Sequence, residues 1–222
     1  MCNLYQVRRS VDEVAAHFRV DVPVGVNTVE EVLPGYPGLV ICEVDGRRTM
    51  QSMVWGFPLR LKGMKPDSKP KPVNNIADLN KGMWVGLARK PQWRCIIPVT
   101  EFAEAEGPKG ARTRTWFNVR DQPIFAWGGL WRESNEWGAV YAGAMTDANA
   151  AVQPVHNRMP VLLMPDEYDR WLYGDFDDLA AFQERRFPDD LVEMNRTSDL
   201  WSRTSKAAMA RQADEIMPRT LL

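Results

Sequence analysis

The second residue of the chain is a cysteine, and its position offers a chemistry that other cysteines lack. Initiator methionine is normally removed ahead of a small residue, so we expect Cys2 to become the mature amino terminus. Such a residue carries an α-amine with a pKa of about 8 beside a thiol with a pKa of about 8.5. Both groups are partly nucleophilic at neutral pH. They can trap an aldehyde, first as an iminium and then as a thiazolidine, although a cysteine at position 2 can also arise by chance.

The other two cysteines have a structural interpretation. Cys42 and Cys95 lie in apolar, strand-like runs, where a buried cysteine behaves as a small hydrophobe. Three cysteines are too few for a disulfide scaffold, so we expect all three to be reduced thiols. No His or Cys spacing suits a metal, and we predict neither a metal nor a cofactor.

Several short segments follow one another in an order that carries more information than any of them alone. They are Met1-Cys2-Asn3-Leu4-Tyr5, Trp55-Gly56-Phe57-Pro58, Asn75-Ile76-Ala77, Arg94-Cys95-Ile96-Ile97-Pro98 leading to Glu104, Thr146-Asp147-Ala148-Asn149, and His156-Asn157-Arg158-Met159-Pro160-Val161. Together they resemble the SOS-response-associated peptidase (SRAP) family, whose opening motif is Met-Cys-Gly-Arg-Phe. Members of that family link covalently to abasic sites through an amino-terminal cysteine. The resemblance implies an abasic site in single-stranded DNA as the partner.

The resemblance implies a catalytic set of Cys2, Asn75, Glu104 and His156. Glu104, in a closed pocket, would act as general acid and base while the carbinolamine forms and dehydrates, because burial raises a carboxyl pKa toward neutrality. His156 titrates near neutrality and would move protons in sugar ring opening and in reversal of the link. Asn75 offers a neutral amide that can orient the amine or donate to a developing oxyanion.

Neighbouring residues compete for two of these roles. Asn74 is a rival to Asn75 by register, and Glu101 and Glu106 are rivals to Glu104 by proximity. In an extended strand Glu101 points away from Glu104, whereas Glu106 shares its face but is expected in the turn before Gly107.

DNA contacts are predicted at a phosphate-binding Arg158, at Lys69 and Lys71, and at Trp55, which with Trp84 is a candidate base-stacking platform. Core packing is the alternative interpretation of the tryptophans, and a solvated loop is the alternative for the lysines. Leu4 and Ala77 stand where the family has arginines. We therefore expect fewer phosphate contacts here than in the family.

The whole chain sets the remaining expectations. Its 222 residues are 45% hydrophobic and 26% charged with a net charge of -1, which suits one domain over 1–222 with at most local attraction for nucleic acid. The sequence has neither a signal peptide nor an apolar stretch of membrane-spanning length. We expect a cytoplasmic monomer that joins the nucleoid when bound to DNA.

Local patterns predict the elements that must position these residues. A helix capped by Ser10 should cover 11–18, and further helices are expected at 165–174 and 205–216. The segment 59–72, with its lysines and prolines, is expected to be an irregular insertion beside a binding groove. Strand-like runs separated by turn signals cover 39–44, 48–55, 95–104, 114–119, 123–131 and 138–145. The fold class is α+β, with a mostly antiparallel, barrel-like sheet and flanking helices.

Two other functions fit some of the same residues. An autoproteolytic cysteine peptidase would use the Cys2 thiolate, activated by His156, to cleave a leader or a separate peptide. A non-catalytic single-stranded DNA-binding module would have lost the chemistry along with the arginines. Lyase activity is a branch of the main prediction, since iminium formation acidifies the C2 proton of the sugar and permits β-elimination.

Overall fold

The computed structural model describes residues 2–22, 25–26, 29–65 and 67–201. Its α-helices are α1 (Val11–Phe18), α2 (Gly82–Ala88), α3 (Tyr168–Tyr173) and α4 (Phe176–Glu184). Short 3₁₀ turns cover Pro91–Trp93, Pro165–Glu167 and Asp189–Leu191. None of the helices in these ranges is both long and apolar enough to cross a membrane.

The strands form two main sheets and a separate hairpin. One sheet has the order β15 (Val192–Leu200), β10 (Thr113–Val119), β9 (Glu101–Glu106), β1 (Tyr5–Gln6) and β2 (Glu31–Val32). The larger sheet has the order β13 (Arg158–Pro160), β12 (Gly138–Asp147), β4 (Arg47–Trp55), β3 (Pro37–Val44), β8 (Arg94–Val99), β11 (Phe125–Ser134) and β14 (Leu162–Leu163), with β7 (Asn75–Ile76) on β12. The hairpin pairs β5 (Phe57–Leu59) with β6 (Lys71–Val73).

The larger sheet closes on itself. Strand β12 pairs with β4 on one side and with β11 on the other, so β12, β4, β3, β8 and β11 form a ring. All the pairings in this ring are antiparallel except β12 with β4. Most residues of β3, β8, β11 and β12 are buried, and apolar and aromatic side chains make up most of this core. This arrangement confirms the predicted α+β, mostly antiparallel, barrel-like fold.

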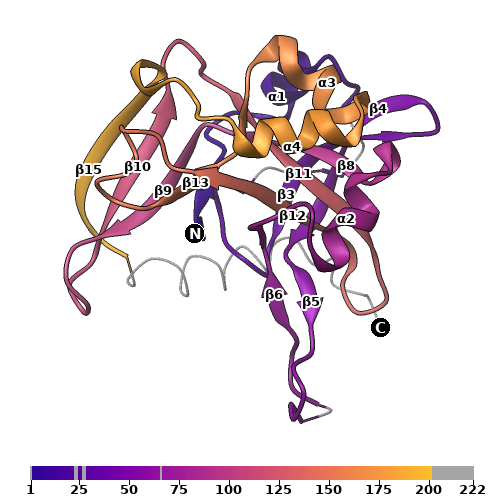
Figure 1. The fold of residues 1–222 in the computed structure, drawn as a ribbon, viewed down its shortest axis with the longest axis horizontal. Helices are drawn as coiled ribbons and strands as arrows, with labels where there is room; N and C mark the ends of the chain where they lie inside the picture. The colour runs from indigo at the N-terminus through magenta and orange to yellow at the C-terminus, as the bar shows by residue number, and fades with distance from the viewer. Residues whose placement is uncertain (1, 23–24, 27–28, 66, 202–222) are drawn as a thin grey trace.

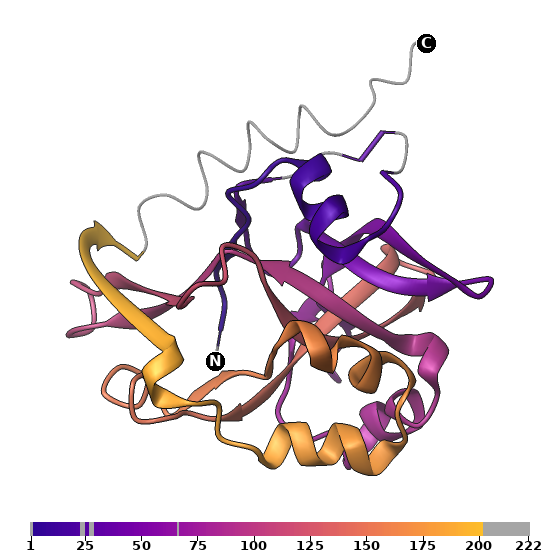
Figure 2. The same ribbon diagram turned by 90° about the horizontal axis from the view of Figure 1, so that it is seen from above.

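Helices α3 and α4 cover the larger sheet (Figures 1 and 2), where α3 packs on β8 and α4 on β12. The indole of Trp171 in α3 reaches into the sheet and donates to the carbonyl oxygen of Cys95 at 3.0 Å. A side chain at Gly128 would place its Cβ 2.7 Å from this indole. Glycine at that position therefore lets the helix approach the sheet closely.

The helix predicted after Ser10 is α1, and it begins as expected. The Ser10 hydroxyl accepts from the Glu13 backbone, and the Glu13 carboxylate accepts from the Ser10 backbone, so the two residues form a capping box. Val14 and Phe18 bury one face of the helix. His17 lies at the edge of that face and makes a 3.0 Å hydrogen bond to the Tyr168 hydroxyl, which gives it a packing role.

The predicted strands all exist, with ends that shift by at most three residues and with the 95–104 run divided into β8 and β9. The segment 59–72 is less irregular than predicted, because its two ends continue the β5–β6 hairpin, which projects from the body of the molecule (Figure 1). The sequence patterns missed α2, α4 and β15, and they also missed the short strands β1, β2, β5, β6, β7, β13 and β14. The helix predicted at 205–216 lies outside the described residues.

Candidate active site around the amino-terminal cysteine

The start of the chain is held inside the smaller sheet. Strand β1 lies between β2 and β9, with Tyr5 opposite Phe102, and the Ala103 amide extends this pairing by donating to the Leu4 carbonyl at 2.9 Å. Because β1 and β9 are antiparallel, the residues before Tyr5 run alongside the part of β9 that contains Glu104. The chain start thus enters the middle of the molecule rather than extending from it (Figure 2).

Two asparagines hold the backbone of Cys2. Its carbonyl oxygen accepts from Asn75 Nδ2 at 2.8 Å and from Asn74 Nδ2 at 3.1 Å, while its thiol donates to the Leu4 carbonyl at 3.5 Å. Cys2 is 0% exposed in this chain, in which Met1 still precedes it. Asn74, predicted only as a rival by register, therefore reaches the same atom as Asn75. Sequence alone carried no signal for this double contact.

Glu104 is a buried carboxyl next to the cysteine. Its side chain comes from β9, is only 3% exposed, and burial raises its pKa from 4.5 to about 7. Burial also raises the pKa of the Cys2 thiol well above its ordinary value, and the Glu104 charge raises it further. A carboxyl that titrates near neutrality can both donate and accept a proton, and here it lies within electrostatic reach of the thiol.

The rival glutamates of β9 have other partners. Glu101, on the opposite face of the strand from Glu104, contacts Gln6 and pairs with Arg8. Glu106 belongs to the strand rather than to the following turn, and its carboxylate accepts from Arg196 and from Thr115. These contacts lower the Glu106 pKa, which leaves Glu104 as the glutamate of β9 suited to proton transfer near neutral pH.

His156 lies in the connection between β12 and β13. Strand β13 begins at Arg158 and forms one edge of the larger sheet. The His156 Nδ1 atom accepts from the Arg158 backbone at 3.0 Å, which sets the orientation of the ring. Burial lowers the His156 pKa, and the charge of the amino terminus lowers it further, so the ring favours the neutral form. The same terminal charge lowers the Glu104 pKa, although burial has the larger, opposite effect. The charge of the amino terminus therefore affects the pKa of both Glu104 and His156.

Base stacking by Trp55 or Trp84 stays a prediction, and it would require their buried rings to become exposed. Trp55 is 0% exposed, and its ring packs edge-on against Tyr5 and Trp127. Trp84 is also buried and packs against Phe57. A ring that is enclosed by the core has no free face for a base. Instead, the Trp55 indole donates to the Asn74 carbonyl at 3.0 Å, which links it to the cysteine site.

The Arg158 guanidinium bonds to other groups of the protein. One guanidinium nitrogen pairs with Asp147 at 3.1 Å, and the other donates to the carbonyls of Ala77 at 2.9 Å and Met145 at 2.8 Å. The guanidinium lines a cleft of about 370 Å³ with Asp78, Asn80, Glu184 and neighbouring residues. Phosphate binding by Arg158 stays a prediction, and it would require exchange of some of these contacts.

The lysine-rich segment remains available to a ligand. Lys69 and Lys71 are exposed on the β5–β6 hairpin, and neither forms an ion pair with any residue in the described ranges. By contrast, Arg114 of β10 is buried and pairs with Glu31 at 2.6 Å. DNA binding by Lys69 and Lys71 stays a prediction.

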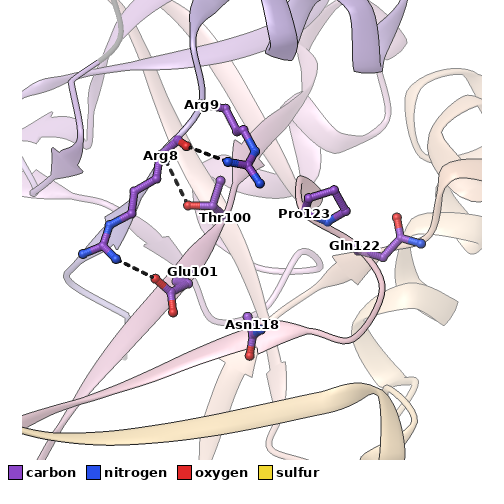
Figure 3. Close-up of a pocket in the computed structure, with 7 residues that line it drawn as sticks. All are labelled: Arg8, Arg9, Thr100, Glu101, Asn118, Gln122 and Pro123. Carbon is purple, nitrogen blue, oxygen red and sulfur yellow. Dashed lines mark hydrogen bonds and ion pairs between the residues drawn. The ribbon is translucent and has the colours of Figure 1, made fainter.

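A second polar cleft has a volume of about 240 Å³ (Figure 3). It is lined by Arg8, Arg9, Thr100, Glu101, Asn118, Gln122 and Pro123. Because Glu101 lines it and Glu104 points to the other face of β9, the sheet lies between this cleft and the cysteine. Within the described ranges, no cluster of three or more His, Cys, Asp or Glu side chains could hold a metal ion.

The chain is similar to known proteins over most of its length. Residues 1–200 match the model of the family described as SOS response associated peptidase (SRAP). The abasic site processing proteins YoqW of Bacillus subtilis (strain 168) and of Bacillus phage SPbeta are each 25% identical to the chain over 211 residues, covering 87% of this chain and 90% of theirs.

Solved structures agree in fold. A protein from Bordetella bronchiseptica has a TM-score of 0.73 at 21% identity, covering 88% of this chain and 99% of its own. A protein from Bacteroides thetaiotaomicron has a TM-score of 0.72 at 18% identity, covering 88% and 91%. With a family match over nearly the whole described chain, this protein belongs to the SOS response associated peptidase (SRAP) family.

Proposed function

We propose that this protein processes abasic sites in single-stranded DNA by forming a covalent link through Cys2 after Met1 has been removed. The observation that carries the proposal is the environment of Cys2, whose carbonyl is held by Asn75 at 2.8 Å while the Glu104 carboxyl lies close enough to affect its thiol. Two relatives that cover most of the chain are named abasic site processing proteins, which supports the same substrate.

The reaction needs no external oxidant or reductant. The Cys2 amine attacks the aldehyde carbon of the ring-opened deoxyribose, and the carbinolamine loses water to give an iminium. The thiol sulfur then adds to the same carbon and gives up its proton, so one water is lost overall. Glu104, with a pKa of about 7, can protonate the leaving hydroxyl and then accept the thiol proton.

His156 is assigned to a different step from Glu104. With its pKa lowered by burial, the neutral ring can accept a proton during opening of the sugar, and its conjugate acid can assist reopening of the thiazolidine. If the thiol closes slowly, loss of the C2 proton from the iminium gives β-elimination, so we include lyase activity in the proposal. Self-processing would cleave the peptide bond between Met1 and Cys2.

Intact mass and denaturing gels test this function. The mature protein, incubated with an abasic oligonucleotide, should gain the mass of that strand less one water. Cys2→Ala should lose the denaturation-resistant link, whereas Cys42→Ala and Cys95→Ala, which remove buried thiols elsewhere in the fold, should keep it. A full-strength link in Cys2→Ala, or in a protein whose amino-terminal tag is shown intact, would refute the mechanism.

A further inference from the structure

Asn74 makes a contact network that the four motif residues do not explain. Its Nδ2 donates to the Cys2 carbonyl at 3.1 Å and to the side-chain oxygen of Asn3 at 3.2 Å. A carboxamide nitrogen has two hydrogens, so both acceptors can be satisfied at once. The opening motif of the family has glycine where this chain has Asn3, and glycine has no side-chain acceptor. The Asn3–Asn74 contact is therefore a feature of this chain rather than of the motif.

The backbone of Asn74 is itself anchored in the core. Its carbonyl oxygen accepts from the Trp55 indole at 3.0 Å and from the Gly143 amide at 3.1 Å. Gly143 cannot carry a side chain, because an added Cβ would lie 2.0 Å from the Trp127 ring. Two donors from two different strands thus fix the position from which the Asn74 side chain reaches Cys2.

We infer that Asn74 is a positioning residue for the reaction of Cys2, with Asn3 orienting its carboxamide and Trp55 anchoring its backbone. The inference rests on the proposed function. Removal of Met1 frees the Cys2 nitrogen, and the hydrogen bonds to its carbonyl then become the main constraint on how the residue is turned. Ring closure requires nitrogen and sulfur to meet at one carbon, so a fixed carbonyl favours the productive arrangement.

The size of the effect follows from the bonds involved. A hydrogen bond of ordinary strength changes a rate or equilibrium by roughly 2- to 12-fold. We expect Asn74→Ala to lower the rate constant for capture of an aldehyde by about that factor. Asn74→Asp should slow it further, because its carboxylate would face the Cys2 carbonyl without a donor. Asn3→Gly, at an exposed position, should have a smaller effect that disappears when Asn74 is already alanine.

The experiment uses the mature full-length chain, with loss of Met1 verified by mass. Capture of glycolaldehyde is followed by intact mass, and single-turnover linkage to an abasic oligonucleotide is followed on denaturing gels. Asn118→Ala is the matched control, because it removes a half-buried asparagine that donates to Glu193 on the smaller sheet. The expected result is a lower rate constant with full final amplitude for Asn74→Ala, and wild-type behaviour for Asn118→Ala.

Other outcomes separate the alternatives. The inference would be overturned if Asn74→Ala captured glycolaldehyde at the wild-type rate. It would also be overturned if Asn3→Gly slowed capture equally whether residue 74 was asparagine or alanine. Reduced amplitude at an unchanged rate constant would also overturn it, since that pattern reports a misfolded fraction. If wild type captures glycolaldehyde in an Asn74-dependent way but never links to abasic DNA, the positioning role stands and the proposed function fails.

Discussion

Glu104 should make the folded protein less stable as the pH rises from about 4.5 to about 7. Its pKa in the folded chain is raised by burial to about 7, from an ordinary value of 4.5. Between these values the folded state binds more protons than the unfolded state, so the free energy of unfolding falls with increasing pH. Glu104→Gln replaces the carboxyl with a neutral group of nearly the same shape. The variant should therefore lack this pH-dependent loss.

The magnitude follows from the pKa. Each pH unit between the unfolded and folded values corresponds to about 1.4 kcal/mol, so the loss reaches about 3 kcal/mol once Glu104 is ionised in both states. Glu104→Gln should exceed wild type by about that amount at pH 8, and by less than about 1 kcal/mol at pH 5. For a chain of 222 residues, 3 kcal/mol corresponds to a Tm difference of roughly 6–12 °C.

Urea unfolding of the mature wild type and Glu104→Gln at pH 5, 6, 7 and 8 measures this difference. Glu106→Gln is a matched control on the same strand, and its effect on stability should change with pH in the opposite direction. Its pKa is lowered by Arg196 and Thr115, so Glu106 stabilises the fold at neutral pH and loses that contribution as the pH falls. A stability gap between wild type and Glu104→Gln that does not change with pH would show that Glu104 is not a buried, shifted carboxyl.

Four functional effects complete the predictions. Because only a few cations, among them the exposed Lys69 and Lys71, are expected to contact phosphates, affinity for an abasic strand should depend weakly on salt. Binding titrations whose slope greatly exceeds roughly 0.7 for each of a few phosphates would contradict this. Ala77→Arg, which places a cation beside the cleft that contains Arg158, should tighten binding of the abasic strand and steepen its salt dependence by about 0.7. Unchanged salt dependence would mean that the strand does not pass over this cleft. His156→Ala should slow release of a preformed link, measured by chase with unlabelled abasic strand, and wild-type formation and release would reduce His156 to a packing residue. Trp55→Phe, which removes the donor to the Asn74 carbonyl, should slow linkage a few-fold while strand affinity is retained; weakened affinity at an unchanged rate would instead favour base stacking.

The sequence was most informative where a local rule decides the outcome. Alternation along a strand places Glu101 and Glu104 on opposite faces of β9, whatever the rest of the fold does. The capping box of Ser10 and Glu13 likewise depends on residues within one turn. Motif order also identified the family correctly over nearly the whole described chain.

Local patterns were less informative where elements are short or are stabilised by distant partners. Strand β15 has mostly exposed residues and is held by its pairing with β10, which no periodicity within 192–200 could indicate. Helix α2 begins at Gly82, and its N-cap residue, Lys81, makes no side-chain capping hydrogen bond, so the helix lacks the usual start signal.

What the sequence by itself determined is which side chains could do chemistry and which way each points within its own element. Tertiary structure decided which of them meet. Placing β1 between β2 and β9 brings Cys2 to Glu104, and the position of β7 beside β12 brings both Asn74 and Asn75 to the Cys2 carbonyl. The enclosure of Trp55 by residues far away in the chain was equally invisible to local pattern. Propensity and periodicity act over a few neighbouring residues, whereas strand pairing and burial depend on segments that are distant in sequence.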